Sequence, residues 1–270
     1  MSAPATVLPF VKTSACGNDF LIIDSKYADA KHALPDLDAF TRLICDRHHG
    51  VGADGVEWLF PSDLADVEIR LINADGSHAE ISGNGTRCVA AYLCAEKEKS
   101  TFQILTGAGI KTCVLTGREG QRFEFETAMG EPKVLGEVIL ALGSGEARGV
   151  SISMGNPHYV VFGAELPSRW KQIAAEIQKM QHNFPDGVNV EFAVVKNAHE
   201  VEARFFERGA GETLSSGTGS CACAVAAIAN GRATSPVQVV APGGTQTVRW
   251  DSEVYLRGPA SILCRGEFFI

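Results

Sequence analysis

The chain has 270 residues, 45% of them hydrophobic, so it is long enough for one large core or two cores of ordinary size. Its net charge is −8 and its pI about 5.4, with charges of both signs mixed, which argues against nucleic acid as a partner. The first residues lack a charged segment followed by an apolar one, and no apolar stretch is long enough to cross a bilayer. We therefore expect a cytoplasmic protein with no membrane partner.

Strands dominate the elements that the hydrophobic pattern predicts. Alternating apolar residues predict strands at 6–12, 20–24, 66–72, 101–105, 110–116, 121–127, 159–163, 190–196, 200–206, 237–240 and 263–269. Two amphipathic helices are expected, at 36–46 and at 168–181. The apolar face of the first contains Leu37, Phe40, Leu43 and Ile44, and that of the second contains Trp170, Ile173, Ile177 and Met180.

Two stretches of the chain resemble each other: "ISGNGTRCVAAYLC" at 81–94 and "LSSGTGSCACAVAA" at 214–227. Each places a serine, Ser82 or Ser216, before a Gly-x-Gly turn and continues as a small-residue apolar run typical of a buried helix. Each amphipathic helix precedes one copy. An internal duplication into two α/β domains, 1–120 and 121–259, explains this order, and the last strand, 260–270, is expected to return to the first domain.

The eight cysteines and the histidine pair do not form a metal or disulfide pattern. No two cysteines are spaced C-x-x-C, and Cys221 and Cys223 are expected on different faces of a helix, so buried free thiols are the favoured interpretation. His48 and His49 are adjacent, so their side chains diverge, and no further ligand lies at metal spacing. We expect no metal.

A glycine-rich turn that opens a helix presents unpaired backbone N–H groups at the positive end of the helix dipole, which makes an anion site. For either copy alone, a tight turn that needs glycine explains the pattern equally well. Two copies related by duplication would face each other across a cleft, and they could hold one carboxylate between them. The doubled motif therefore predicts a carboxylate-bearing substrate.

Polar residues near these turns suggest that the substrate is an amino acid. Arginine forms a bidentate pair with a carboxylate, while asparagine and glutamate oxygens accept hydrogen bonds from an ammonium group. Each asparagine alone could equally be a turn former. The residues are Asn18, Asn73, Asn156, His158, Asn189, Glu207 and Arg208. A pocket with one group on each face of an α-carbon is the geometry of a two-base racemase, in which one face loses a proton and the other receives one.

The chain resembles the diaminopimelate epimerases in its motifs, nearly from end to end. The motifs are "KTSACGNDFLIID", "RHHGVGADGV", "INADGSHAEISGNGTRC", "SMGNPHYVVF", "FPDGVNVEF", "ERGAGETLSSGTGSCA" and "APGG". The resemblance implies an α+β fold of two pseudosymmetric domains, with mostly antiparallel strands around a central buried helix. It also implies epimerisation of LL- to meso-diaminopimelate without pyridoxal phosphate, any other cofactor or a metal, in a homodimer.

The resemblance also implies roles for individual residues. Substrate-binding positions correspond to Asn18, Asn73, Asn156, Asn189, Glu207 and Arg208, and the turns that hold the α-carboxylate correspond to Gly83, Asn84, Gly217 and Thr218. His158 and Glu207 correspond to polar groups beside the second catalytic residue.

The chain departs from the family pattern at Ser82 and Ser216, where the resemblance implies two acid/base cysteines. An alcohol ionises about 7 pK units higher than a thiol, which corresponds to roughly 10 kcal/mol. Cys88 and Cys221 lie about 7–9 Å further along their helices and are expected in the core. Gly55 is a second departure, because many members have a larger polar residue there.

Three interpretations of the serines remain open. The chain is an epimerase whose cysteines were changed to serine, a natural double-serine epimerase that uses another base, or a relative with another activity. The last class includes a racemase or isomerase of another amino acid and a pseudoenzyme that binds an amino acid without turnover.

Overall fold

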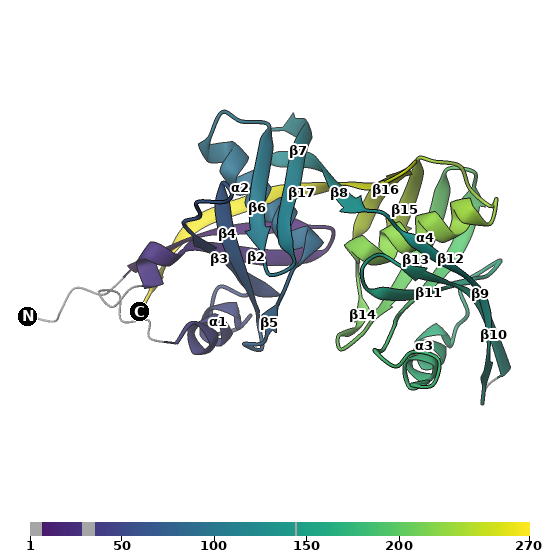
Figure 1. The fold of residues 1–270 in the computed structure, drawn as a ribbon. Coiled ribbons are helices and arrows are strands. Elements are labelled where there is room, and N and C mark those ends of the chain that lie inside the picture. The colour runs from purple at the N-terminus through teal and green to yellow at the C-terminus, as the bar shows by residue number, and fades with distance from the viewer. Residues whose placement is uncertain (1–6, 29–35, 144) are drawn as a thin grey trace, which may run out of the picture. The chain divides into compact units, whose positions relative to one another are not determined.

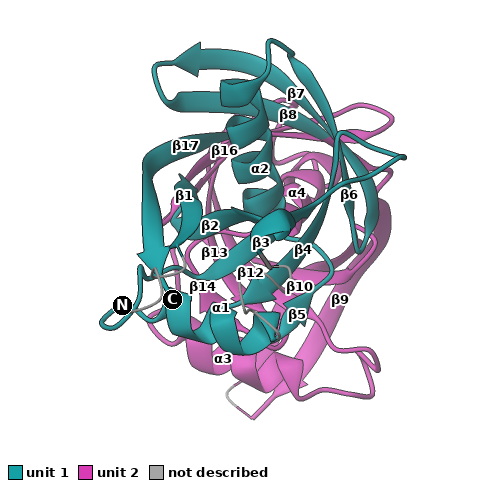
Figure 2. Ribbon diagram, turned by 90° about the vertical axis from the view of Figure 1, so that its left-hand side faces the viewer, with its two compact units in different colours: residues 1–127, 259–270 teal, residues 128–258 magenta. Residues whose placement is uncertain are grey.

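The computed structural model describes residues 7–28, 36–143 and 145–270 (Figure 1). The chain divides into two compact units, coloured separately in Figure 2. Unit 1 comprises the chain up to Thr127 together with Pro259–Ile270, and unit 2 comprises Ala128–Gly258. The domain cut expected near Gly120 falls in the turn before strand β8 (Arg122–Gly130). Residue 6, the first of the expected strand 6–12, lies outside the described residues.

Within the described residues, each unit contains two α-helices and a set of mostly antiparallel strands. The elements up to the end of β8 are β1 (Val7–Ala15), β2 (Asn18–Asp24), the 3-10 helix η1 (Ser25–Ala28), α1 (Leu37–Cys45), β3 (Gly55–Phe60), β4 (Val67–Asn73), β5 (His78–Ala79), α2 (Gly83–Glu96), β6 (Thr101–Thr106), β7 (Gly109–Glu119) and β8. The elements that follow are β9 (Lys133–Leu142), β10 (Gly145–Ser153), β11 (Pro157–Phe162), α3 (Trp170–Gln178), β12 (Asn189–Asn197), β13 (Glu200–Glu207), β14 (Gly211–Thr213), α4 (Gly217–Ala229), β15 (Val237–Ala241), β16 (Gly244–Trp250) and β17 (Val254–Phe269).

The two units repeat one pattern of strand pairing. In unit 1, β1, β2, β3, β4, β6 and β7 pair in that order, alternating between antiparallel and parallel. In unit 2, β10, β11, β12, β13, β15 and β16 pair with the same alternation. The second half of β17 pairs with β1, while its first residues pair with β16. An internal duplication would leave such a repeat.

The two small-residue helices lie in the cores of their units, as the sequence predicts. Helix α2 packs within a cluster drawn from β1, β2, β4, β6, β7 and β8, and nine consecutive residues of α4, 219–227, are fully buried. Each helix begins at its serine. The Ser82 hydroxyl accepts from the Gly85 N–H at 3.0 Å, and the Ser216 hydroxyl accepts from the Gly219 N–H at 3.1 Å. The expected fold class, strands around a central buried helix in each half, is confirmed.

The amphipathic helices α1 and α3 pack on a second cluster in each unit. Phe40 and Ile44 of α1 are buried beside Trp58, and Ala174 and Ile177 of α3 are buried against strands of unit 2. Two details of the expectation are wrong. Leu43, placed on the apolar face, is 50% exposed because it projects at the margin of that face. Met180 lies beyond the end of α3, which stops at Gln178, although its side chain still packs on the cluster.

The hydrophobic pattern missed four long strands and two short ones. Strand β3 is buried along nearly its whole length, and β9 is exposed along nearly its whole length, so neither alternates between apolar and polar residues. Strands β10 and β16 and the short β5 and β14 were also missed. Period-two alternation detects only a strand with one buried and one exposed face.

Seven of the eight thiols are buried, as expected, whereas Cys264 is exposed. All eight cysteines are free. Burial raises the pKa of the Cys88 thiol to about 12, so it is no substitute for a catalytic thiol. His48 and His49 are exposed. Across residues 7–28, 36–143 and 145–270, no helix is long and apolar enough to span a membrane, and no cluster of His, Cys, Asp and Glu has a metal-binding arrangement.

Candidate active site

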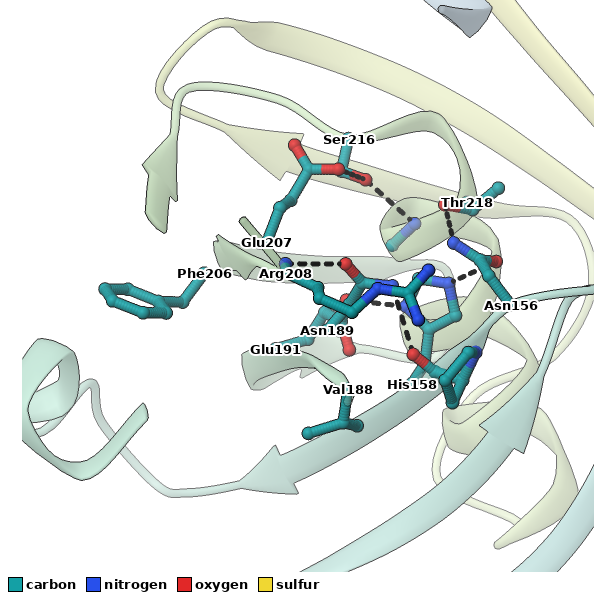
Figure 3. Close-up of polar contacts among 12 residues, drawn as sticks. Asn156, His158, Val188, Asn189, Glu191, Phe206, Glu207, Arg208, Ser216 and Thr218 are labelled. Atoms are coloured by element: carbon teal, nitrogen blue, oxygen red, sulfur yellow. Dashed lines mark hydrogen bonds and ion pairs between the residues drawn. The ribbon is translucent and has the colours of Figure 1, made fainter. Parts of the chain in front are cut away.

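In unit 2 the candidate site is built around the first turn of α4 (Figure 3). Ser216 is the N-cap of this helix and is 4% exposed. Its hydroxyl donates to Oε2 of Glu207 at 3.0 Å while it accepts from the Gly219 N–H. Oε1 of Glu207 accepts from the Thr213 hydroxyl at 2.7 Å. The serine oxygen is therefore held between a helix N-terminus and a carboxylate, which can take the hydroxyl proton.

His158 lies beneath this turn in a chain of hydrogen bonds. Nδ1 of His158 is 2.7 Å from Oε1 of Glu191, Nε2 is 3.0 Å from Oδ1 of Asn156, and Nδ2 of Asn156 donates to the Thr218 hydroxyl at 3.4 Å. His158 and Glu191 are both fully buried. Burial raises the pKa of the Glu191 carboxyl, and the His158 ring beside it opposes that rise. A ring whose two nitrogens face acceptors is fixed in orientation.

Asn189 and Arg208 complete the unit 2 group. Asn189 donates to the carbonyl of Pro157 and accepts from the backbone N–H of Arg208, both at 3.0 Å. The Arg208 side chain is exposed and donates to the carbonyl of Asp186. The backbone of Arg208 is thus fixed by Asn189, while its guanidinium group keeps N–H donors for a ligand.

In unit 1 the candidate site is built around the first turn of α2. Asn84 donates to Oδ1 of Asn18 at 2.7 Å, and Asn18 donates to Oδ2 of Asp54 at 3.1 Å. The buried Arg87 donates in turn to Oδ1 of Asn84. A Cβ added to Gly83 would meet no atom within 4 Å, so the space over this glycine is open to a ligand. The structure thus brings Asn18, Ser82, Gly83 and Asn84 together.

Asn73 is not drawn into this group by a hydrogen bond. Its side chain donates to the Ser77 hydroxyl at 3.0 Å, and on the sheet it lies opposite Gly55. A Cβ on Gly55 would lie 2.7 Å from the carbonyl oxygen of Ile72, so β4 leaves no room for a side chain at this position. Glycine at 55 is therefore required by the close approach of the neighbouring strand.

Strand register relates the polar positions of the two units. In unit 1 Phe20 lies opposite Gly55, and in unit 2 His158 lies opposite Asn189. Two residues further along the same strands lie Glu57 on β3 and Glu191 on β12. By the same register Asn73 on β4 corresponds to Glu207 on β13. Each unit therefore has a serine-capped helix and a buried glutamate, but the remaining polar side chains differ.

The sequence analysis missed four residues of these groups: Asp54, Glu57, Arg87 and Glu191. One signal could have found the two glutamates. In "GVEWLF" and "NVEF" a glutamate stands inside an otherwise apolar strand, where a charged residue is rarely buried without a function or a partner.

Comparison with known proteins gives a consistent result. The family model described as diaminopimelate epimerase matches residues 10–135 and 150–263. Diaminopimelate epimerase of Desulfitobacterium hafniense is 38% identical over 96% of this chain and 97% of that protein, and that of Methanococcus maripaludis is 32% identical over 97% of this chain and its own full length.

Among solved structures, a hydroxyproline epimerase from Agrobacterium vitis, with bound trans-4-hydroxy-L-proline, superimposes with a TM-score of 0.71 at 16% identity, covering 98% of this chain and 93% of that one. A methylitaconate-delta-isomerase superimposes with a TM-score of 0.69 at 13% identity, covering 99% of this chain and 96% of that one. At such identities these likenesses establish the fold alone.

Proposed function

The chain belongs to the diaminopimelate epimerase family, and on that premise we propose that it is an isomerase that converts LL-diaminopimelate to meso-diaminopimelate. The reaction inverts one α-carbon, so a proton leaves one face and another arrives at the opposite face. We assign one face to Ser82 and the other to Ser216. The protein would act in the cytoplasm, as a homodimer, on this small-molecule substrate.

The observation that carries this proposal is the pair of serine-capped helices built on one plan. Gly83, Asn84, Gly217 and Thr218 form the first turns of α2 and α4, where N–H groups and the helix dipole attract a carboxylate. Each serine caps its helix, so a carboxylate bound at the helix start lies next to the serine oxygen.

On the unit 2 face, Glu207 supplies the base. The Ser216 hydroxyl already donates to Glu207, so proton transfer from the α-carbon to the serine oxygen can be matched by transfer of the hydroxyl proton to the carboxylate. The Glu191–His158–Asn156 chain holds the polar groups beneath this pair. Glu207 and His158 are accordingly assigned supporting roles at this face.

The remaining polar residues bind the carboxylate and ammonium groups of the substrate. The Arg208 guanidinium suits the carboxylate at the far end of diaminopimelate, and the amides of Asn18, Asn73, Asn156 and Asn189 suit its ammonium and carboxylate groups. Arg208 is exposed and its backbone is fixed by Asn189, which fits a residue that closes on the distal end.

The test compares the chain with a Ser82→Cys/Ser216→Cys version on LL-diaminopimelate. Formation of the meso form is followed by chiral chromatography, and binding by calorimetry. Both proteins should bind the substrate with similar affinity, while the double-cysteine version turns it over faster by several orders of magnitude, because the thiol ionises about 7 pK units lower.

Other outcomes identify the alternatives. A double-cysteine version that binds diaminopimelate without turnover would indicate an amino-acid-binding pseudoenzyme. Preference of both proteins for a different amino acid would indicate a racemase or isomerase of that compound.

A further inference from the structure

Glu57 is a buried carboxyl group without a partner. It lies on β3, is fully buried, and neither of its carboxyl oxygens has a hydrogen-bond partner within the described part of the chain. Its neighbours across the sheet are Ile22 and Leu71, which offer no polar atom from their side chains. Leaving a carboxyl group in such surroundings is costly, so its retention calls for a specific role.

The equivalent glutamate in unit 2 has a partner. Glu191 occupies the same register position on β12, is equally buried, and is 2.7 Å from Nδ1 of His158. In unit 1 the position of His158 is taken by Phe20, which cannot form a hydrogen bond. The unit 1 carboxyl therefore lacks the group that holds its counterpart.

The Glu57 carboxyl is aimed at the first turn of α2. A Cβ added to Gly85 would overlap Oε1 of Glu57 and would lie 3.2 Å from Cβ of Ser82. The carboxyl oxygen and the serine side chain therefore border the same small space, which only glycine at 85 leaves open. The Ser82 hydroxyl oxygen accepts a hydrogen bond from the Gly85 N–H. Within the described residues, no group accepts a hydrogen bond from the Ser82 hydroxyl.

We propose that Glu57 is the proton acceptor behind Ser82, so that the unit 1 serine works with a carboxyl group as Ser216 works with Glu207. This inference rests on the proposed function. The Ser82 oxygen takes the α-proton while its own hydrogen passes to Glu57, and the electron pair of the broken C–H bond stays on the α-carbon. Glu57 ends as a neutral acid. In the opposite direction it returns a proton through Ser82 to the carbanion. Glu57 acts through Ser82 and is therefore a positioning residue.

The ionisation of Glu57 makes the two directions of reaction respond oppositely to pH. Burial raises the pKa of Glu57 to about 8. Cys88 on α2 is a titratable group that interacts with the Glu57 charge, and since the pKa of that thiol is about 12, it stays neutral over the relevant range. Proton removal through Ser82 needs the carboxylate and rises through pH 8, whereas proton delivery through Ser82 needs the acid and falls through pH 8.

The experiment measures exchange of the α-proton of LL- and meso-diaminopimelate in deuterated water, from pH 6 to 10. For the unaltered chain, kcat/KM for one isomer should rise through about pH 8 while that for the other falls. In the Glu57→Gln variant, the pH dependence of kcat/KM should disappear for both isomers. Exchange of the isomer whose kcat/KM rises with pH should also drop by about 100-fold or more, the scale of a lost general base. Cys88→Ala is the control, because it alters the core beside Glu57 and should leave both pH profiles in place.

Three results would overturn the inference. Profiles of the unaltered chain without an ionisation near pH 8 would do so without any variant, as would a folded Glu57→Gln protein that keeps both profiles. A serine chain that exchanges neither isomer, beside a double-cysteine version that epimerises LL-diaminopimelate, would refute the role of Glu57 and leave the proposed function intact. Failure of both proteins to bind or exchange diaminopimelate would instead refute the proposed function.

Discussion

The two units share a scaffold but not a set of polar partners. Both place a serine at the N-cap of a buried helix and a buried glutamate at the third residue of the equivalent strand. In unit 2 the serine donates to Glu207 and the buried Glu191 pairs with His158. In unit 1 the residues at the positions of Glu207 and His158 are Asn73 and Phe20.

This difference shows which features of a duplicated scaffold are tied to backbone geometry. The helix cap and the glycines of the first turn are needed to begin each helix in the core, so they recur. The side chains around them can diverge. Gly55 shows the limit of that freedom, because β4 approaches too closely for the asparagine found at the equivalent position 189.

The largest effect is expected from replacing one serine at a time. Ser82→Cys and Ser216→Cys should each speed proton exchange of only one diaminopimelate isomer, by orders of magnitude, and should give little epimerisation, because inversion also needs the group on the other face. Proton NMR of each isomer in deuterated water measures exchange. A single-cysteine protein that epimerises as fast as the double-cysteine protein would contradict the claim that each unit supplies the group for one face.

The next effect concerns stability and pH. Burial raises the pKa of Glu57 in the folded protein from its ordinary 4.5 to about 8, so the stabilisation that its proton gives is fully present below pH 4.5 and is lost as the pH rises to 8. The loss is at most about 5 kcal/mol, from 1.4 kcal/mol per pK unit. Glu57→Gln lacks this loss and should be the more stable protein at pH 9. Urea unfolding at pH 5, 7 and 9 measures the free energy of unfolding of both proteins. If this free energy changed with pH in the same way in both, the raised pKa would not belong to Glu57.

A third prediction uses two glycines of one helix turn. Gly85→Ala places a methyl group where Oε1 of Glu57 lies and should destabilise the protein by about 3 kcal/mol, the upper range for overpacking. Gly83→Ala meets no atom and is the matched control, with little or no loss. Chemical unfolding measures both. Adding Glu57→Ala should remove most of the Gly85→Ala penalty, and a strictly additive double variant would show that the carboxyl is not the obstacle.

The smallest effect is expected at Arg208. Arg208→Ala removes a charge-assisted pair with the distal carboxylate, so diaminopimelate binding should weaken by about 2 kcal/mol, while alanine binds equally poorly to both proteins. Calorimetry with the two ligands measures this. Unchanged diaminopimelate affinity would point to another substrate.

Much of the fold could be predicted from the sequence. The serine–glycine stretches predicted both buried helices, because a capping residue before small apolar residues specifies a helix start and a close-packed interior. Strands such as β3 and β9 escaped detection, because burial on both faces or on neither leaves no alternation.

That these residues form a substrate site stays a prediction, whereas their contacts in the structure can be compared with the sequence. Asn18 contacts Asn84, Asn156 contacts Thr218 and Asn189 contacts Arg208, since each asparagine stands beside a turn that the motifs define. That the Glu57 carboxyl lies at the first turn of α2 and that Glu191 pairs with His158 depends on strand register, which links positions far apart in the chain. Register follows from packing of the whole sheet, and no local pattern encodes it.

The most direct test of the account follows the origin of the proton in the product. LL-diaminopimelate is incubated with the chain in deuterated water and stopped after a small fraction has reacted, and the substrate and the meso product are separated and analysed by mass spectrometry. If one group on each face handles one proton, the product should carry solvent deuterium at the inverted carbon from the start. Product that retains the substrate's own α-proton would show that a single group serves both faces, and it would contradict the assignment of Ser82 and Ser216 to opposite faces.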